Sequence, residues 1–363
     1  MLKLDRREFL AGAGAGFLSA LGGPAAAALD DADMLFASAC RFEEGDYGAV
    51  IFSERGEIIR QVRLPDRGHD VVFDRAGRRA VAFARRPGNF ALCFSADSRE
   101  TPVAFASKAG RHFYGHGAFS GDGRLLYATE NDFSQARGVI GIYDATGGFN
   151  RVGEFDSHGV GPHELLMMPD GHTLAICNGG IETHPDYGRA KLNIDRMKPS
   201  LVFIDSRDGR LIESHELPTD LHQLSIRHMQ VRPDGCIFFG GQYEGPEIDM
   251  PPLIGRAVMG ERFELFDIAD DDRRPFRNYI GSVAVSRDGS RFAVSSPRGN
   301  IVAVLDAASG RILERWPLHD GCGLAADRNG FMATSGDGMA GTLGDMAQEK
   351  VFFDNHIARA DNA

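Results

Sequence analysis

The sequence predicts an all-β fold, a seven-bladed β-propeller closed by strands from both termini. The first observation is a repeat: His69, His116 and His163 follow one another at intervals of 47 residues, and each opens a short apolar run. A fixed period of roughly 40 to 50 residues is typical of propellers, in which each unit is one small sheet. The second observation is a recurring turn that contains glycine, which supplies the positive φ needed by tight antiparallel hairpins.

Each predicted unit reads as strand, turn, strand, loop and strand. After His116 an apolar run leads to a Gly-Asp-Gly turn, and a second apolar run follows before the polar stretch 130–132. Turns of this composition join neighbouring antiparallel strands, so the units that carry one are predicted to be blades. Six units carry such a first turn, at Arg75-Ala76-Gly77, Gly121-Asp122-Gly123, Pro169-Asp170-Gly171, Pro233-Asp234-Gly235, Arg287-Asp288-Gly289 and Arg328-Asn329-Gly330.

The seventh blade is expected to combine both ends of the chain. Three apolar segments within residues 34–65 read as the later strands of a unit, but no first strand precedes them. The C-terminal segment 353–358 supplies it, because it is in phase with the start of the unit at 67–71. We therefore predict that the strand near His356 pairs with residues 35–39. Closure of this kind removes free sheet edges.

Residues 1–28 are predicted to be an export signal, which leaves 29–363 as a single propeller domain. Arg6 and Arg7 precede an apolar run that is rich in Gly and Ala and ends in small residues, as in twin-arginine signals. An uncleaved membrane anchor is the alternative, although the run is shorter than the roughly 20 residues needed to span a bilayer. Removal of the signal leaves about 48 residues for each blade, within the usual range. We expect a periplasmic protein that has no membrane contact after cleavage.

The net charge of −11 and the cysteine pattern exclude several classes of protein. Nucleic acid is not an expected partner, because binding to phosphates depends on a basic surface. The five cysteines form no C-x-x-C pair and no haem-attachment motif, and several lie in apolar strand segments. They are therefore expected to be small buried hydrophobic residues.

Five histidines are the candidate metal ligands. Because the innermost strand of each blade lines the channel, residues at the start of these strands are expected to meet at one end of it. Neutral imidazoles, with carboxylates such as Glu130 or Glu164, suit iron, copper or zinc, and sets with open positions suit iron in particular. In the alternative interpretation each histidine hydrogen-bonds within its own blade, as the Gly-His pair does in WD-type repeats. The predicted ligands are His69, His116, His163, His228 and His356.

Polar residues of both signs are expected at the same end of the channel, in the loops between second and third strands and just before the first strands. The interval from His163 to His228 is 65 residues, which makes 178–198 an insertion, and insertions often lie on the binding face. The arginines have two interpretations: they clamp an anionic ligand, or they neutralise an acidic rim. The predicted ligand-binding residues are Arg86, Arg111, Glu130, His184, Arg189, Gln242 and Arg298.

The same segments carry a resemblance to a known family. The strings RHFYGHGAFSGDGRLLYATEND, GVGPHELL, NGGIETHPDYGRAKLN, LSIRHM, YIGSVAVS, SSPRGN, DGCG and FDNH resemble those of a bacterial propeller family of unknown function that is exported by the twin-arginine pathway. The genes of that family often neighbour those of imelysin-type iron-uptake proteins. The resemblance covers the mature chain, with Phe353 where the family has Trp. It implies a role near iron acquisition, with other periplasmic iron-uptake proteins as partners.

Two classes of function remain open at the level of the sequence. The first is a binding role, in which an accessory protein holds a small molecule or a metal ion, iron or another divalent metal, at the mouth of the channel. The second is an enzyme of the lactonase or quinoprotein-like oxidoreductase type, because propellers serve both chemistries. The sequence contains no nucleophile elbow, no phosphate-binding loop and no dinucleotide-binding fingerprint.

Overall fold

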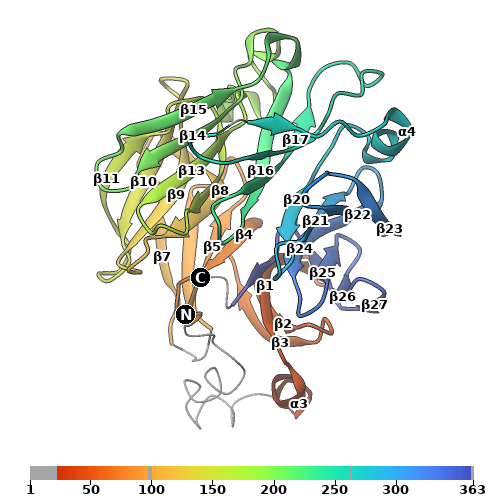
Figure 1. Ribbon diagram of the computed structural model, residues 1–363. Helices are drawn as coiled ribbons and strands as arrows, with labels where there is room; N and C mark the ends of the chain where they lie inside the picture. The colour runs from red at the N-terminus through yellow and green to blue at the C-terminus, as the bar shows by residue number, and fades with distance from the viewer. Residues whose placement is uncertain (1–22, 97–99, 262, 361–363) are drawn as a thin grey trace.

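Seven antiparallel sheets follow one another along the chain and form the blades of a β-propeller (Figure 1). The computed structural model describes residues 23–96, 100–261 and 263–360. The predicted fold class is confirmed, and so is the number of blades. Arg6, Arg7 and the rest of the predicted signal up to residue 22 lie outside the described residues.

Six blades are continuous in sequence and run outward from the channel in chain order. Blade 1 comprises β4 (Gly68–Phe73), β5 (Arg79–Ala84), β6 (Phe90–Ser95) and β7 (Val103–Ala106). Blade 2 comprises β8 (Arg111–Phe119), β9 (Leu125–Asp132), β10 (Arg137–Asp144) and β11 (Asn150–Asp156). Blade 3 comprises β12 (Pro162–Met167), β13 (Thr173–Asn178), β14 (Ser200–Asp205) and β15 (Leu211–Glu216).

The second half of the ring repeats this order. Blade 4 comprises β16 (Leu224–Val231), β17 (Ile237–Tyr243), β18 (Ile254–Ala257) and β19 (Glu264–Leu265). Blade 5 comprises β20 (Ser282–Val285), β21 (Arg291–Ser296), β22 (Ile301–Asp306) and β23 (Ile312–Pro317). Blade 6 comprises β24 (Gly321–Ala326), β25 (Phe331–Ser335), β26 (Met339–Thr342) and β27 (Asp345–Gln348).

Blade 7 closes the ring with strands from both ends of the chain. Its outer strands are β1 (Leu35–Phe42), β2 (Tyr47–Ser53) and β3 (Ile58–Arg63), and its innermost strand consists of β28 (Val351–Phe353) and β29 (Ala358–Arg359). Cys40 pairs with Phe353, and Ala37 pairs with Ala358, so the predicted closure is confirmed. Figure 1 shows the red strands β2 and β3 beside the blue blade 6. The Phe353 ring packs against Phe52 with the centroids 5.3 Å apart.

The predicted turns form because their side chains complete the hairpins. In blade 2, Asp122 Oδ1 accepts a hydrogen bond of 3.0 Å from the Arg124 amide, and Gly123 has φ +70°. A side chain is strained at that φ, which is why glycine occupies the position. The predicted insertion 178–198 is also present, as the connection between β13 and β14, and it contains the short helices η1 (Pro185–Tyr187) and η2 (Ile194–Arg196).

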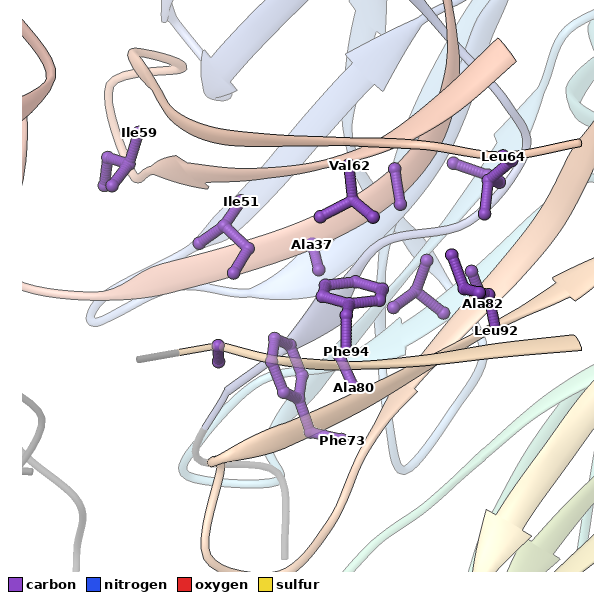
Figure 2. Packing of buried hydrophobic residues seen from close by; sticks show 14 of the residues in the cluster. Ala37, Ile51, Ile59, Val62, Leu64, Phe73, Ala80, Ala82, Leu92 and Phe94 are labelled. Carbon is purple, nitrogen blue, oxygen red and sulfur yellow. The ribbon is translucent and has the colours of Figure 1, made fainter. Parts of the chain in front are cut away.

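The hydrophobic core lies between the blades. Among the described residues, seven clusters of buried apolar side chains each join two neighbouring blades. Figure 2 shows the cluster between blades 7 and 1, where Ile51 and Val62 face Phe73 and Phe94. Since each blade is covered on both faces, side chains on both sides of its central strands are buried. In β22, for example, only the first and last residues are half-buried. The ring therefore holds the inner strands at fixed angles to one another.

The N-terminal part of the described chain packs on the outside of this ring. Helix α3 (Gly23–Asp31) extends across the predicted signal boundary at residue 28, and it buries Ala28 and Leu29 in the cluster of blades 7 and 1. Three further short helices lie in connections: η3 (Thr219–Leu221), α4 (Asp270–Arg273) and η4 (Arg274–Phe276). No helix among the described residues is long and apolar enough to cross a membrane. All five cysteines are free and buried, as predicted.

Candidate metal centre

The five predicted histidines converge inside the channel. His69 lies on β4, His116 on β8, His163 on β12 and His228 on β16, while His356 lies between β28 and β29. The His116 ring is 4.6 Å from that of His356 and 4.8 Å from that of His163, measured between centroids. The His228 ring is 4.8 Å from both His163 and His356. Five blades thus contribute one imidazole each to a single cluster, in which His163 is half-buried and the other four histidines are buried.

Irregularities in the innermost strands turn these side chains toward the axis. The register of β4 against β5 shifts between Gly68 and Val71, which brackets His69. The same shift occurs around His116 and His163, and immediately before His228. A bulge adds an unpaired residue to one strand and re-aims its side chain. The bulges therefore explain why a histidine at the start of an inner strand faces its counterparts rather than a neighbouring blade.

Three of the imidazoles are oriented by carboxylates that lie on the preceding blade. Asp354 Oδ1 is 3.1 Å from His69 Nδ1, and Asp70 Oδ2 is 3.0 Å from His116 Nδ1. Glu164 Oε2 is 3.3 Å from His228 Nδ1 and also accepts a hydrogen bond from the Met229 amide. A carboxylate on Nδ1 holds the proton there and leaves the Nε2 lone pair free. For these three histidines the partner is not in their own blade, contrary to the alternative interpretation.

Three ring nitrogens in the cluster are buried and have no hydrogen-bond partner within the described chain. They are His116 Nε2, His356 Nε2 and His163 Nδ1. His163 lacks a carboxylate because the residue that follows the histidine of the preceding blade is Gly117, where blades 1 and 3 have Asp70 and Glu164. Buried nitrogens without partners are rare, and each calls for an explanation such as an ion.

The spacing of the ring nitrogens fits a single ion. One nitrogen from each of His69, His116 and His163 lies within 4.8 Å of the others, and the same holds for His116, His228 and His356. Three nitrogens bonded to one ion at about 2.1 Å lie at most about 3.6 Å from one another. The side chains therefore have to draw together by about 1 Å at the widest of these separations to form the bonds. His116 belongs to both groups, so it is the central candidate among the possible ligands.

Burial keeps most of the cluster in the protonation state that binds metals. Desolvation, followed by the charge of His116, lowers the pKa of His69, His163, His228 and His356. Desolvation also opposes protonation of His116, but the hydrogen bond and charge of Asp70 outweigh it and raise its pKa. Burial raises the pKa of Glu164 to about 8. Neutral imidazoles are the ligating form, and a cation among them would favour the ionised form of the surrounding carboxylates.

Three of the four predicted ligand-binding arginines lie around the mouth, which we define as the end of the channel where innermost strands begin and second strands end. Arg86 and Arg298 follow the second strands of blades 1 and 5, and Arg189 belongs to the insertion 178–198. Burial, followed by the charge of Arg227, lowers the pKa of Arg86 to about 10. A pocket of about 390 Å³ opens on this side, and Arg67, Arg85 and Arg298 are among the residues that line it.

Gln242 and His184 are committed to contacts within the protein. Gln242 is buried in β17, and its Nε2 donates a hydrogen bond of 3.1 Å to the Ile280 carbonyl. His184 caps helix η1, because its Nδ1 accepts a hydrogen bond of 3.2 Å from the Asp186 amide. Its ring also lies 5.0 Å from that of Phe133. Both residues are near the mouth, but their polar atoms support the loops.

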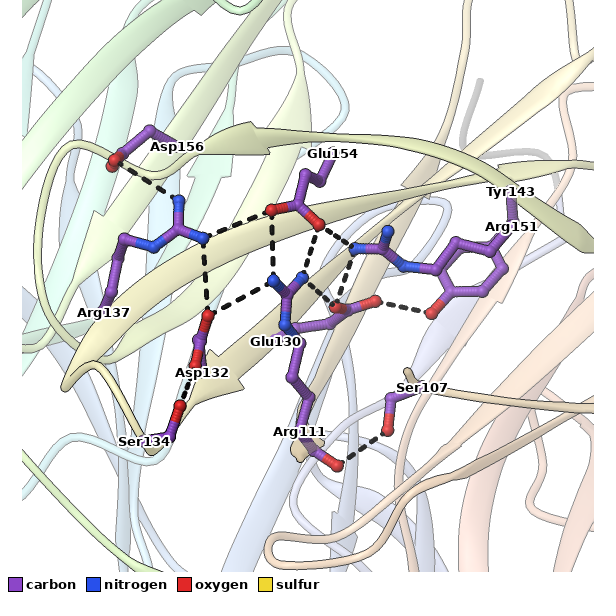
Figure 3. A network of polar contacts seen from close by, with 10 residues as sticks. All are labelled: Ser107, Arg111, Glu130, Asp132, Ser134, Arg137, Tyr143, Arg151, Glu154 and Asp156. Carbon is purple, nitrogen blue, oxygen red and sulfur yellow. Dashed lines mark hydrogen bonds and ion pairs between the residues drawn. The ribbon is translucent and has the colours of Figure 1, made fainter. Parts of the chain in front are cut away.

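Arg111 and Glu130 lie apart from the other candidates, in an ion-pair network within blade 2 (Figure 3). The expectation that residues 130–132 form a loop is wrong, because β9 continues to Asp132 and pairs with Arg137 of β10. Glu130 is completely buried, and it contacts Arg111 at 3.4 Å and the Tyr143 hydroxyl at 2.5 Å. Arg111 also binds Glu154 at 2.7 Å. The charged ends of Arg111 and Glu130 are therefore paired within blade 2 and lie away from the other candidates.

The sequence prediction did not include several residues that the structure brings to the site. Asp70 and Asp354 were not recognised. For Asp70 a signal was visible, because an acidic residue directly follows the histidine in both His69-Asp70 and His163-Glu164. Arg67, which binds Asp354 at 2.7 Å, carries no local motif that would identify it, whereas Arg85, which binds Asp354 at 2.8 Å, belongs to the same predicted loop at the mouth as Arg86.

Comparison with known proteins supports the fold. The family described as "Protein of unknown function (DUF1513)" matches residues 62–360. No curated protein matches the chain. The chain is similar in structure to hydrazine synthase of Kuenenia stuttgartiensis, with a TM-score of 0.61 and 14% identity over 84% of this chain and 89% of that one. It is also similar to the Cps50 (Swd1) β-propeller domain of Myceliophteria thermophila, with a TM-score of 0.56 and 13% identity over 82% and 93%.

Proposed function

This chain belongs to the family described as "Protein of unknown function (DUF1513)", and because that description names no activity we propose a function from the site itself. We propose that the protein binds one transition-metal ion through the histidines of its channel. The protein acts as a ligand- or metal-binding accessory protein. Imidazole ligands suit iron, copper, zinc and nickel, so the donor set limits the metal to this group.

The observation that carries the proposal is the orientation of the imidazoles. Asp354, Asp70 and Glu164 contact three Nδ1 atoms, which leaves Nε2 of His69, His116 and His228 as the ring nitrogens available to a metal. Carboxylates in this position are the usual outer partners of histidines that bind metals, and they raise the basicity of the ligand. A histidine with a purely structural role is expected to have both ring nitrogens hydrogen-bonded or in contact with water. In His116 and His356, by contrast, Nε2 is buried and has no hydrogen-bond partner among the described residues.

We further propose that the metal is iron and that the protein works in the periplasm. This part of the proposal depends on the resemblance to the exported family whose genes neighbour imelysin-type iron-uptake proteins. Those iron-uptake proteins are the proposed partners. The export signal contributes to the argument as well, because twin-arginine substrates cross the membrane already folded and so retain a metal loaded in the cytoplasm.

Elemental analysis tests the metal proposal. Wild-type protein purified from its export compartment is expected to contain close to one equivalent of a transition metal, and His116→Ala and His356→Ala are expected to contain almost none. His172→Ala is the control, because that histidine is half exposed and lies in a turn at the opposite end of the channel. A wild type that contains no metal, and that binds none when iron, zinc or copper is added, would exclude the proposal.

Export is tested separately with the signal. Replacing Arg6 and Arg7 with lysines is expected to leave the precursor in the cytoplasm, because the twin-arginine pathway requires the arginine pair. Cell fractionation followed by immunoblotting measures the result, with the single Lys3→Arg variant as the control. If the double variant is exported normally, or if export stops only when the general secretory channel is blocked, the assignment to this pathway is wrong.

A further inference from the structure

The pocket at the mouth carries an excess of positive charge. Its lining includes four arginines, Arg41, Arg67, Arg85 and Arg298, and two acidic residues, Asp320 and Asp354, which leaves a formal excess of two positive charges. The protein as a whole has a net charge of −11, so the charge of the pocket lining is opposite in sign to that of the whole chain. A concave site lined by one sign of charge attracts ligands of the opposite sign.

Asp354 cannot neutralise the whole pocket because its oxygens are already in use. Oδ1 accepts hydrogen bonds from Arg85 Nη1 and from the Asn355 amide, and it contacts His69 Nδ1. Oδ2 accepts a hydrogen bond of 2.7 Å from Arg67 Nε. The aspartate therefore links the pocket to the histidine cluster and has little remaining capacity for another cation.

The other two arginines have aromatic neighbours and no acidic partner within the described residues. The guanidinium of Arg298 lies 4.5 Å from the centre of the Tyr279 ring, and that of Arg41 lies 4.2 Å from the centre of the Phe352 ring. Stacking on an aromatic face holds a guanidinium flat and leaves its N–H edge available for a carboxylate. Both arginines are exposed at the pocket wall, where a ligand reaches them directly.

The excess of positive charge continues across the mouth beside Arg85. Arg86, the next residue, has Arg227 and Arg189 as charged neighbours and forms no ion pair within the described chain. Next to it lies the buried Tyr114 hydroxyl, which has Thr183 as a neighbour. The unpaired charge of Arg86, in addition to the pocket, favours a ligand with several acceptor oxygens.

We propose that this pocket binds a small organic polycarboxylate, with carboxylates paired to Arg41 and Arg298 at the mouth above the histidine cluster. The volume of about 390 Å³ lies within the range for small-molecule sites, and the walls of Tyr47, Tyr279 and Phe352 suit a carbon skeleton. Inorganic phosphate would fill only a small part of this space. The inference does not depend on the metal proposal, because the arginines are present whether or not an ion is bound.

Isothermal titration calorimetry of metal-free protein with tricarballylate tests the inference. Tricarballylate is a tricarboxylate without the hydroxyl group that makes citrate a strong chelator, so it binds metal ions much more weakly than citrate does. We expect one binding site per chain. Arg298→Gln and Arg41→Gln are each expected to weaken binding by roughly tenfold or more, because each removes a charge-assisted pair. The control Arg124→Gln, an exposed arginine in the turn between β8 and β9, is expected to bind like the wild type.

The outcomes separate the two proposals. Arg298→Gln is expected to keep the metal content of the wild type, and His116→Ala is expected to bind tricarballylate with the affinity of the wild type. Each substitution therefore tests one proposal without affecting the other. Absence of tricarballylate binding, or equal affinity in the wild type and both pocket variants, would overturn the inference. Binding of inorganic phosphate as tight as that of tricarballylate would overturn the assignment to polycarboxylates.

Discussion

Replacing His116 with alanine is expected to abolish the stabilisation of the protein by metal. In the wild type, a metal at about 1,000 times its dissociation constant stabilises the folded state by about 4 kcal/mol, because only the folded chain assembles the ligands. His116 lies in both groups of candidate ligands, so its loss disrupts either arrangement. Thermal unfolding with and without added metal measures the effect, which should be a rise in Tm for the wild type and none for the variant.

Two comparisons keep this result interpretable. His172→Ala is the matched control for loss of an imidazole, and its Tm is expected to respond to metal as the wild type does. His116→Gln preserves a polar side chain beside Asp70 but cannot reproduce the imidazole ligand, so it separates loss of the Asp70 contact from loss of metal. If the histidine is only part of the scaffold, the Tm of metal-free His116→Ala falls by an amount equivalent to about 1 to 3 kcal/mol, and metal changes neither protein.

Replacing Arg111 with alanine is expected to destabilise the fold by about 3 kcal/mol, through the ion-pair network of Figure 3. The side chain of Arg111 is 6% exposed and that of its partner Glu130 is 0% exposed, so removal of the arginine leaves a buried carboxylate with fewer partners. Arg151 still contacts Glu130 at 3.2 Å, which limits the loss. Urea unfolding measures the change in the free energy of unfolding.

Arg137 provides the matched control because it contacts Asp132 and Glu154, two of the same acids, but its side chain is 37% exposed. Arg137→Ala is expected to cost about 1 kcal/mol or less, as exposed ion pairs do. Equal effects of the two substitutions would show that burial does not determine the strength of this network.

The same network predicts a dependence on pH. The hydrogen bond from Arg111, ahead of the other charges, lowers the pKa of Glu154 from 4.5 to about 2. A carboxylate with a lowered pKa stabilises the folded state above its unfolded pKa and loses that contribution as the pH falls through its folded pKa. Wild-type stability should therefore fall between about pH 4.5 and pH 2 more steeply than that of Arg111→Ala. Parallel curves for the two proteins in this range would contradict the assignment.

The fold was predictable because each blade carries its own local signals. The Gly-containing turns are features of single units, and the 47-residue spacing of His69, His116 and His163 shows directly in the sequence that the unit repeats. Closure was predictable for the same reason, since residues 353–358 resemble the start of a unit. The convergence of the histidines then followed from the symmetry of the ring.

The contacts between blades were not predictable in this way. Whether Asp70 reaches His116 depends on the angle between blades 1 and 2, which is set by the packing of apolar clusters rather than by any local motif. Glu130 was placed in a loop because the polar stretch Glu130-Asn131-Asp132 looks like one. In the structure the ion pairs with Arg111 and Arg151 allow acidic residues to continue a buried strand.

The central claim is that the histidines of the channel hold one metal ion, and anomalous diffraction from a metal-loaded crystal tests it most directly. We expect one peak in the channel, within about 2.0 to 2.2 Å of a ring nitrogen of each of His116, His228 and His356. Asp70 and Glu164 should remain hydrogen-bonded to Nδ1 of His116 and His228. A crystal grown at saturating metal that shows no anomalous peak among these histidines, or shows the ion bound only elsewhere, would contradict the account.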